Sequence, residues 1–279
     1  MSNKIRFSKS ADETKGFNTA QLRQNYLIES VFKPNEITCT YSMQDRFMIL
    51  GIQPTKKALT LPVFEPLTKA KFFLERREIG ILNVGGNGRI TIDGEMFLMQ
   101  NKDILYIGRG KQNIVFESLD TATPALFYAN SCTAHASHPT VHIPKSAIKP
   151  LELGDFSTAN KRLIYQAIIP TRLTTCQLVM GFTELITPSI WNTMPAHTHF
   201  RRNEVYFYFD LPENQFVMHL MGEPQETRHL VVRNHQSVIS PEWSVHSGAG
   251  SASYSFVWAM AGENQDYTDM DKVELSELL

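Results

Sequence analysis

The sequence has few cysteines, no long apolar run and no excess of charge of either sign. Its three cysteines, Cys39, Cys132 and Cys176, include no Cys-x-x-Cys pair. Neither a disulfide framework nor a cysteine zinc site is therefore predicted, and we expect three reduced, mostly buried thiols. No stretch approaches the roughly 20 consecutive apolar residues of a spanning helix, and the first residues are polar without an apolar export signal. We expect a cytoplasmic protein that does not bind membranes.

The charges nearly cancel, with 27 Lys and Arg against 28 Asp and Glu. This balance removes the broad electrostatic attraction that non-specific nucleic-acid binding requires, so no nucleic-acid partner is predicted. Hydrophobic residues make up 42% and charged residues 20% of the chain, which excludes disordered and collagen-like classes. A length of 279 residues suits two modest domains or one large β architecture.

The pattern of turns and apolar residues predicts an all-β protein with one short N-terminal helix. Asn18 is the expected N-cap of that helix, in the segment TAQLRQNYLIES, and Gln21 stands at the capping-box spacing. Elsewhere short strands alternate with turn residues, as in antiparallel sandwiches and barrels. The predicted strands cover 81–84, 89–93, 96–99, 104–107, 113–116 and 125–129 in the first half, and 176–182, 205–209, 216–221, 229–233, 237–240 and 254–260 in the second.

The two series of strands indicate a β unit used twice. The segment between them, residues 131–155, is rich in Pro, Ser and Ala, which suits a crossing between domains. We place the boundary near residue 150 and predict domains over 1–150 and 151–279. The run ERRE at 75–78 resembles RRNE at 201–204, which favours duplication, with chance similarity as the alternative.

A set of histidines and one glutamate predicts a metal site in the second half. His197 and His199 are two residues apart, so on a strand their imidazoles share one face. Glu204 follows, and His246 stands in the run SPEWSVHSG. Three imidazoles and a carboxylate suit zinc, iron or manganese. A lone histidine is more often structural, but the joint pattern HxHx4E followed by PxxxxH resembles the two-part signature of cupin barrels.

The resemblance extends to one enzyme family over nearly the whole chain. The 5-keto-4-deoxyuronate isomerase family is similar to this sequence in the runs WNTMPAHTHFRRNEVYFYFD, HLMGEPQETRHLVVRN, WAMAGENQDYTDMD and FLERREIGILNVGGNGRITIDGE. The resemblance implies a duplicated cupin, built as two jelly-roll barrels, that assembles as a homohexamer. It also implies one zinc ion per subunit, held in the C-terminal barrel by His197, His199, Glu204 and His246.

The activity that this resemblance implies is an aldose–ketose isomerisation in pectin and uronate breakdown. The substrate is 4-deoxy-L-threo-5-hexosulose uronate, and the product is 3-deoxy-D-glycero-2,5-hexodiulosonate. The N-terminal barrel is expected to be metal-free, because Glu78 stands where the metal carboxylate would be, no HxH precedes it, and Asn113 lies near the third histidine position. Glu78 is then expected to be held by Arg76 or Arg77.

The isomerisation passes through an enediolate, which a divalent cation stabilises while a separate base moves the proton. Glu226, in the run GEPQETRH, is the first candidate for that base, with a solvated turn residue as the alternative. Arg228, or the pair Arg201 and Arg202, is a candidate for holding the substrate carboxylate. Tyr206 is a candidate to present its phenol to the pocket.

Three other functions fit parts of this pattern. A 5-deoxy-glucuronate isomerase would share the fold and the chemistry, and a cupin dioxygenase would use the same ligands with iron and oxygen. A non-catalytic sugar-binding cupin would keep the barrel without turnover. The intact ligand set favours catalysis.

Overall fold

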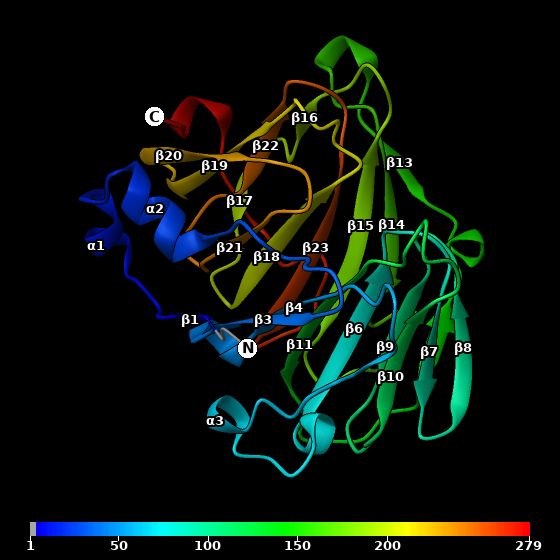
Figure 1. The fold of residues 1–279 in the computed structure, drawn as a ribbon. Coiled ribbons are helices and arrows are strands. Elements are labelled where there is room, and N and C mark those ends of the chain that lie inside the picture. The colour runs from blue at the N-terminus through cyan, green and yellow to red at the C-terminus, as the bar shows by residue number, and fades with distance from the viewer. Residues whose placement is uncertain (1–3) are drawn as a thin grey trace. The chain divides into compact units, whose positions relative to one another are not determined.

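The computed structural model describes residues 4–279 and consists mainly of β-strands (Figure 1). The chain divides into two compact units. Among the described residues, the first contains Val31–Lys149, Ala167–Leu178 and residues 4–5, and the second contains Arg6–Ser30, Pro150–Gln166 and Val179–Leu279. The predicted all-β class is confirmed. The division into domains at residue 150 stays a prediction.

Each unit contains one seven-stranded and one four-stranded sheet. From one edge to the other, the larger sheet of the first unit contains β1 (Lys4–Arg6), β3 (Ile37–Ser42), β4 (Met48–Ile52), β11 (Phe127–Thr133), β6 (Arg77–Asn83), β9 (Ile104–Ile107) and β12 (Val141–Ile143). Its smaller sheet contains β5 (Leu59–Thr60), β10 (Ile114–Ser118), β7 (Gly88–Ile92) and β8 (Glu95–Met99). Ile79 and Ile81 of β6 share one hydrophobic cluster with Ile90 and Ile92 of β7, so the core fills the space between the two sheets.

The second unit repeats this order of strands. Its larger sheet contains β13 (Leu151–Leu153), β14 (Arg162–Ile168), β15 (Val179–Leu185), β23 (Ser255–Gly262), β18 (Arg202–Phe209), β21 (Ser237–Ser240) and β2 (Leu27–Ile28). Its smaller sheet contains β16 (Trp191–Asn192), β22 (Ser247–Gly250), β19 (Val217–Glu223) and β20 (Glu226–Val232), and β17 (His197–Thr198) pairs separately with β24 (Asp271–Lys272). Because β18 lies between β23 and β21 as β6 lies between β11 and β9, the predicted duplication is confirmed.

Short helices lie between the strands along the chain. They are α1 (Ala11–Lys15), α2 (Thr19–Tyr26) and α3 (Glu65–Thr68), with 3-10 turns at Gln44–Arg46, Phe73–Glu75, Lys145–Ala147, Phe156–Thr158 and Leu275–Glu277. The predicted capping box is present, since Asn18 Oδ1 accepts from Gln21 N at 3.0 Å and Gln21 Oε1 accepts from Asn18 N at 2.9 Å. None of the helices within residues 4–279 is long and apolar enough to cross a membrane.

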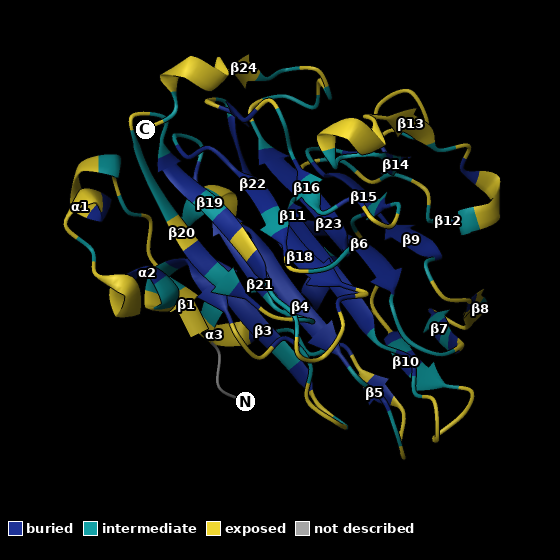
Figure 2. Cartoon of the chain, turned by 90° about the horizontal axis from the view of Figure 1, so that it is seen from above, coloured by how far each residue is buried: buried dark blue, intermediate teal, exposed yellow. Residues whose placement is uncertain are grey.

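The helix α2 belongs to the second unit, although it precedes β3 and all later strands of the first. It ends at Tyr26 because the next two residues form β2 and pair with β21. Arg23 Nη1 donates to the carbonyl of Val231 at 3.1 Å, which fixes the helix beside β20. Figure 2 shows α1 and α2 largely exposed, whereas most strands are buried.

Glu78 is fully buried on β6, and its carboxylate accepts five hydrogen bonds. The donors are Tyr106 Oη at 2.7 Å, Cys132 Sγ at 3.4 Å and the backbone amides of Cys176, Gln177 and Leu178 at 2.8 Å each. Side chains alternate along a strand, so Glu78 faces away from the core that contains Ile79 and Ile81. It therefore does not occupy the interior position that a metal-binding carboxylate would need.

The prediction that an arginine holds Glu78 is wrong. Arg77 Nε donates to Ser131 Oγ at 3.0 Å, and Arg76 Nη2 donates to the backbone carbonyl of Lys69 at 2.6 Å. The three thiols, in contrast, are free as predicted, with Cys39 and Cys132 buried and Cys176 half-buried. Backbone amides replace the guanidinium as partners of Glu78 because the segment 176–178 is adjacent to it.

We expect Glu78→Gln to lower the free energy of unfolding by about 1–3 kcal/mol, because the amide presents a donor where the carboxylate accepts hydrogen bonds. Chemical denaturation measures the change, and Glu95→Gln, at an exposed position on β8, is the control. Equal stability of the two variants would contradict the structural role of Glu78.

Candidate functional site

Four predicted ligands converge at one end of the second barrel. His197 lies on β17 with His199 directly after it, Glu204 lies on β18, and His246 directly precedes β22. His197 Nε2 is 3.2 Å from His199 Nε2 and 3.0 Å from His246 Nε2. Glu204 Oε2 is 3.1 Å from His199 Nε2 and 3.0 Å from His246 Nε2. All four residues are buried, and their ligand atoms lie within 4.8 Å of one another.

The arrangement of protons within this group fits a cation at its centre. His199 Nδ1 lies 2.7 Å from the backbone carbonyl of Asp269, and donating its proton there leaves the Nε2 lone pair facing the other ligands. Glu204 Oε2 is buried and faces the Nε2 atoms of His199 and His246. Two ligand atoms that each lie about 2.1 Å from a metal ion, at right angles to one another, are ~3.0 Å apart. The distances between the nitrogen and oxygen atoms of this group agree with that value. The group can therefore bind a divalent metal ion.

Burial and mutual contact set the protonation states that metal binding requires. Burial, followed by the neighbouring His246 and His199, lowers the pKa of His197 well below its usual value. Burial alone would raise the pKa of Glu204, but the contacts with His246 and His199 outweigh it and lower that pKa well below its usual value. A neutral imidazole and an ionised carboxylate are the forms that coordinate a metal.

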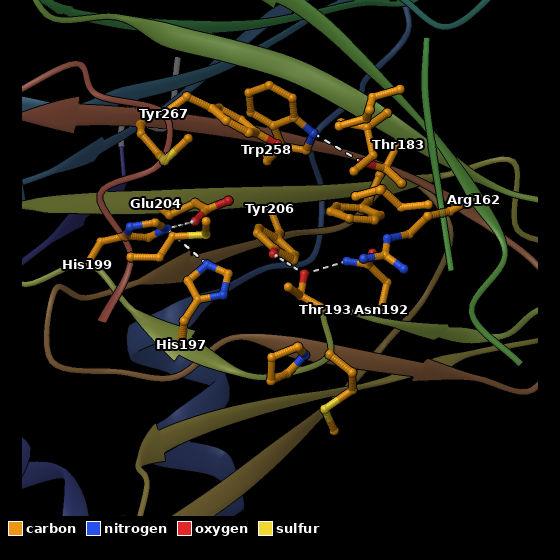
Figure 3. A pocket seen from close by; sticks show the side chains of 18 of the residues that line it. Arg162, Thr183, Asn192, Thr193, His197, His199, Glu204, Tyr206, Trp258 and Tyr267 are labelled. Atoms are coloured by element: carbon orange, nitrogen blue, oxygen red, sulfur yellow. Dashed lines mark hydrogen bonds and ion pairs between the residues drawn. The ribbon is translucent and has the colours of Figure 1, made fainter. Parts of the chain in front are cut away.

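A cavity of about 210 Å³ opens onto three of these residues, His197, His199 and Glu204. It is lined by Leu151, Leu153, Arg162, Ile164, Thr183, Asn192, Thr193, Met194, Pro195, His197, His199, Glu204, Tyr206, Phe256, Trp258, Met260, Tyr267, Met270 and Lys272. Figure 3 shows Tyr206 between the imidazoles on one side and Arg162 on the other. The lining combines three candidate metal ligands, one guanidinium and a largely apolar remainder.

Tyr206, the candidate phenol, lines the cavity. It lies on β18 two residues after Glu204, so both side chains face the smaller sheet. Its Oη is 3.1 Å from Thr193 Oγ1. Burial, and then the charge of Glu204, raises the pKa of Tyr206 well above its usual value. The phenol therefore stays protonated and can donate a hydrogen bond to a bound molecule.

Arg162 lines the cavity, although the sequence assigned it no role. Its Nη1 donates to the carbonyl of Asn160 at 3.0 Å, and its Nε is buried without a partner. Burial lowers the pKa of Arg162, while nearby tyrosines, Tyr267 first among them, raise it. The arginine comes from β14, a strand that the sequence pattern did not predict.

Glu226 and Arg228 do not line this cavity. They form an ion pair of 2.9 Å at a separate small depression that Lys15 and Trp243 also line. The Glu226 side chain is 43% exposed, and Arg228 Nη2 also donates to the carbonyl of Lys15 at 2.5 Å. This placement argues against both predicted roles, because neither group reaches a molecule bound beside the histidines.

Arg201 and Arg202 are also committed elsewhere. Arg201 forms ion pairs with Asp269 at 2.6 Å and Asp271 at 2.7 Å. Arg202 Nη1 donates to the carbonyl of Asp266 at 2.6 Å. Both arginines therefore fix the segment that carries the Asp269 carbonyl, and neither lines the cavity.

Known proteins resemble this chain over nearly its whole length. Residues 33–277 match the model of the KduI/IolB family. A 4-deoxy-L-threo-5-hexosulose-uronate ketol-isomerase of Formosa agariphila is 50% identical over 98% of this chain and 97% of its own. The protein of the same description from Lachnoclostridium phytofermentans is 48% identical over 98% and 99%, and that from Yersinia pseudotuberculosis is 49% identical over the same shares.

Solved structures support the fold. An IolB-like protein from Salmonella typhimurium superimposes with a TM-score of 0.72 at 15% identity, over 89% of this chain and 97% of its own. An oxalate decarboxylase from Lactobacillus farciminis gives a TM-score of 0.55 at 10% identity, over 83% and 80%. At these identities the likeness concerns the fold alone.

We expect His246→Ala to weaken metal binding by at least about tenfold, because it removes one of four converging donors. Elemental analysis of the purified protein after dialysis measures the metal retained, and His229→Ala, at an exposed position on β20, is the matched control. Full metal content in the His246 variant would exclude this residue as a ligand.

Proposed function

The chain belongs to the KduI/IolB family, and on that premise we propose that it is a metal-dependent ketol-isomerase. It converts 4-deoxy-L-threo-5-hexosulose uronate into 3-deoxy-D-glycero-2,5-hexodiulosonate. The observation that carries this proposal is the 50% identity, over 98% of the chain, to a ketol-isomerase of that specificity. The buried group of three histidines and one glutamate supplies a fitting site.

His197, His199, Glu204 and His246 hold one divalent ion per subunit in this proposal, and the ion is Zn²⁺. Neutral imidazoles and a carboxylate are common zinc ligands, while iron and manganese accept the same set. When bound, such an ion stabilises the negative charge that develops on two neighbouring oxygens of the substrate.

Arg162 holds the substrate carboxylate, in place of the arginines first predicted. Its buried guanidinium has an Nε without a partner, and guanidinium forks match carboxylates. The separation of Arg162 and the histidines on either side of Tyr206 suits an extended molecule with its carboxylate at one end and its reacting carbonyl at the other (Figure 3).

Tyr206 donates a proton or hydrogen bond from Oη to a substrate oxygen. Burial keeps this phenol protonated, and Thr193 Oγ1 at 3.1 Å orients it. The aromatic and apolar lining, Phe256, Trp258 and Met260 among it, excludes water from the reacting carbons.

Assembly and compartment follow from the same family resemblance. We place the enzyme in the cytoplasm as a homohexamer. A 5-deoxy-glucuronate isomerase would use the same chemistry at this site on a different substrate, so an activity assay distinguishes it from the proposed enzyme. A dioxygenase would consume oxygen, and a binding module would show no turnover.

The assay incubates the metal-loaded enzyme with the product of an unsaturated-uronate lyase and follows ketose formation by NMR, without nicotinamide cofactor. We expect turnover by the wild type, and Tyr206→Phe to lower kcat by about 10²-fold while metal content is unchanged. Turnover of 5-deoxy-glucuronate alone would instead assign the second specificity.

Replacing Arg162 by Gln is expected to raise KM at least about tenfold, because one charge-assisted contact with the substrate is lost. The matched control is Arg228→Gln, the arginine of the separate depression, which should keep the KM of the wild type. Steady-state kinetics decide between them. A raised KM in the Arg228 variant only would restore the role first predicted for that residue.

A further inference from the structure

The first barrel has a cavity of its own at the end where the second barrel carries its metal-binding group. Arg77 begins β6 and shares a face with Ile79, so it points into the space between the two sheets. Thr133, the last residue of β11, lines the same cavity. In the second unit, the corresponding strands β18 and β23 place Glu204 and Met260 at the other cavity. The cavity of the first barrel is the larger, at about 470 Å³.

Four arginines line this cavity, and none of the lining residues that the structure describes is acidic. They are Arg46, Arg76, Arg77 and Arg109. Arg77 is only 5% exposed. A buried guanidinium without a counter-ion is costly, so an anion in the cavity would relieve an existing electrostatic penalty.

Neutral backbone carbonyls hold three of these side chains in place. Arg77 Nη2 donates to Ser131 O at 2.8 Å and to Arg46 O at 2.6 Å. Arg76 Nη2 donates to Thr68 O at 3.2 Å and to Lys69 O at 2.6 Å. Arg109 donates from Nε to Glu75 O at 2.8 Å and from Nη1 to His135 O at 3.0 Å. Carbonyls orient the guanidinium groups without cancelling their charge. The positive side chains are thus preorganised, which lowers the entropic cost of binding.

Among the ion pairs that the structure describes for these arginines, Glu75 is the acidic partner. Glu75 Oε2 is 3.8 Å from Arg76 Nη2, and the same oxygen accepts from the Lys71 amide at 2.9 Å. Glu75 does not line the cavity, so it leaves the space beside the guanidinium groups open to an anion.

We propose that this cavity is a binding site for a small organic anion, a sugar acid or a sugar phosphate. The four arginines that line the cavity hold the carboxylate or phosphate oxygens, because arginine forks match both groups. Tyr41 and Phe73 in the wall contact the carbon skeleton. This site does not depend on the proposed isomerase activity.

Calorimetry on the full chain tests the proposal with D-galacturonate and glucose 6-phosphate as probes, and with neutral D-galactose and inorganic phosphate as comparisons. We expect saturable binding of at least one sugar anion with a Kd below about 1 mM, and none of galactose. The tighter of the two probes identifies the class. Binding of inorganic phosphate alone, or of no anion, overturns the proposal.

Variants locate the binding. The double substitution Arg46→Gln with Arg76→Gln is expected to raise the Kd at least about tenfold, since it removes two of the four charges. Arg89→Gln, whose side chain pairs with Glu117 on the sheet surface, controls for loss of an arginine in the same unit. Arg162→Gln controls for binding at the other cavity. Unchanged affinity in the double variant, or loss only in the Arg162 variant, places the anion elsewhere and overturns the site.

The double variant is also assayed for isomerisation, with an unchanged rate expected because its residues belong to the first barrel. An inactive wild type would count against the proposed function and leave the binding result readable. A change of oligomeric state in the double variant without any anion binding would show that the arginines serve an interface, which also overturns the proposal.

Discussion

The convergence of three imidazole nitrogens and one carboxylate oxygen at a buried position is the constraint on which the rest of the second unit depends. Three imidazole nitrogens and one carboxylate oxygen at 3.0 to 3.2 Å cannot satisfy one another by hydrogen bonds alone. The neighbouring elements serve this arrangement. Asp269 fixes the tautomer of His199, and Arg201 and Arg202 fix the segment that carries Asp269. Loss of any one support leaves buried polar atoms without partners.

The duplicated architecture distinguishes two contributions to a site. The fold determines where a cavity lies, and the side chains that line it determine its chemistry. Both barrels place the start of one central strand and the end of its neighbour at a cavity, but one cavity has the candidate metal ligands and the other has four arginines. Glu78 shows the same point within one strand. Its carboxylate faces away from the barrel interior, where it accepts from three consecutive backbone amides and stabilises the segment 176–178. The fold therefore does not determine function, since one scaffold accommodates different chemistry.

Local spacing made much of this predictable. The HxH pair, the capping box at Asn18 and the alternating strands depend on geometry within a few residues, and the structure has them where they were expected. The face of Glu78 was not predictable, because a shift of one residue along a strand reverses the side chain. The role predicted for Glu226, and the missing role of Arg162, depended on which strands line which cavity. The order of the strands in the sheets determines which strands line a cavity. This order cannot be inferred from the residues next to Glu226 or Arg162 in the sequence.

The bond from His199 to the Asp269 carbonyl has a consequence for the biogenesis of the protein. The two residues are 70 positions apart, and β24 then pairs with β17 beside the ligand His197. A nascent chain that has already made all four ligands still lacks the acceptor that fixes one imidazole. A metal ion held by this group would therefore be bound tightly only after the last part of the barrel has been synthesised and closed, and incomplete chains would compete poorly for it.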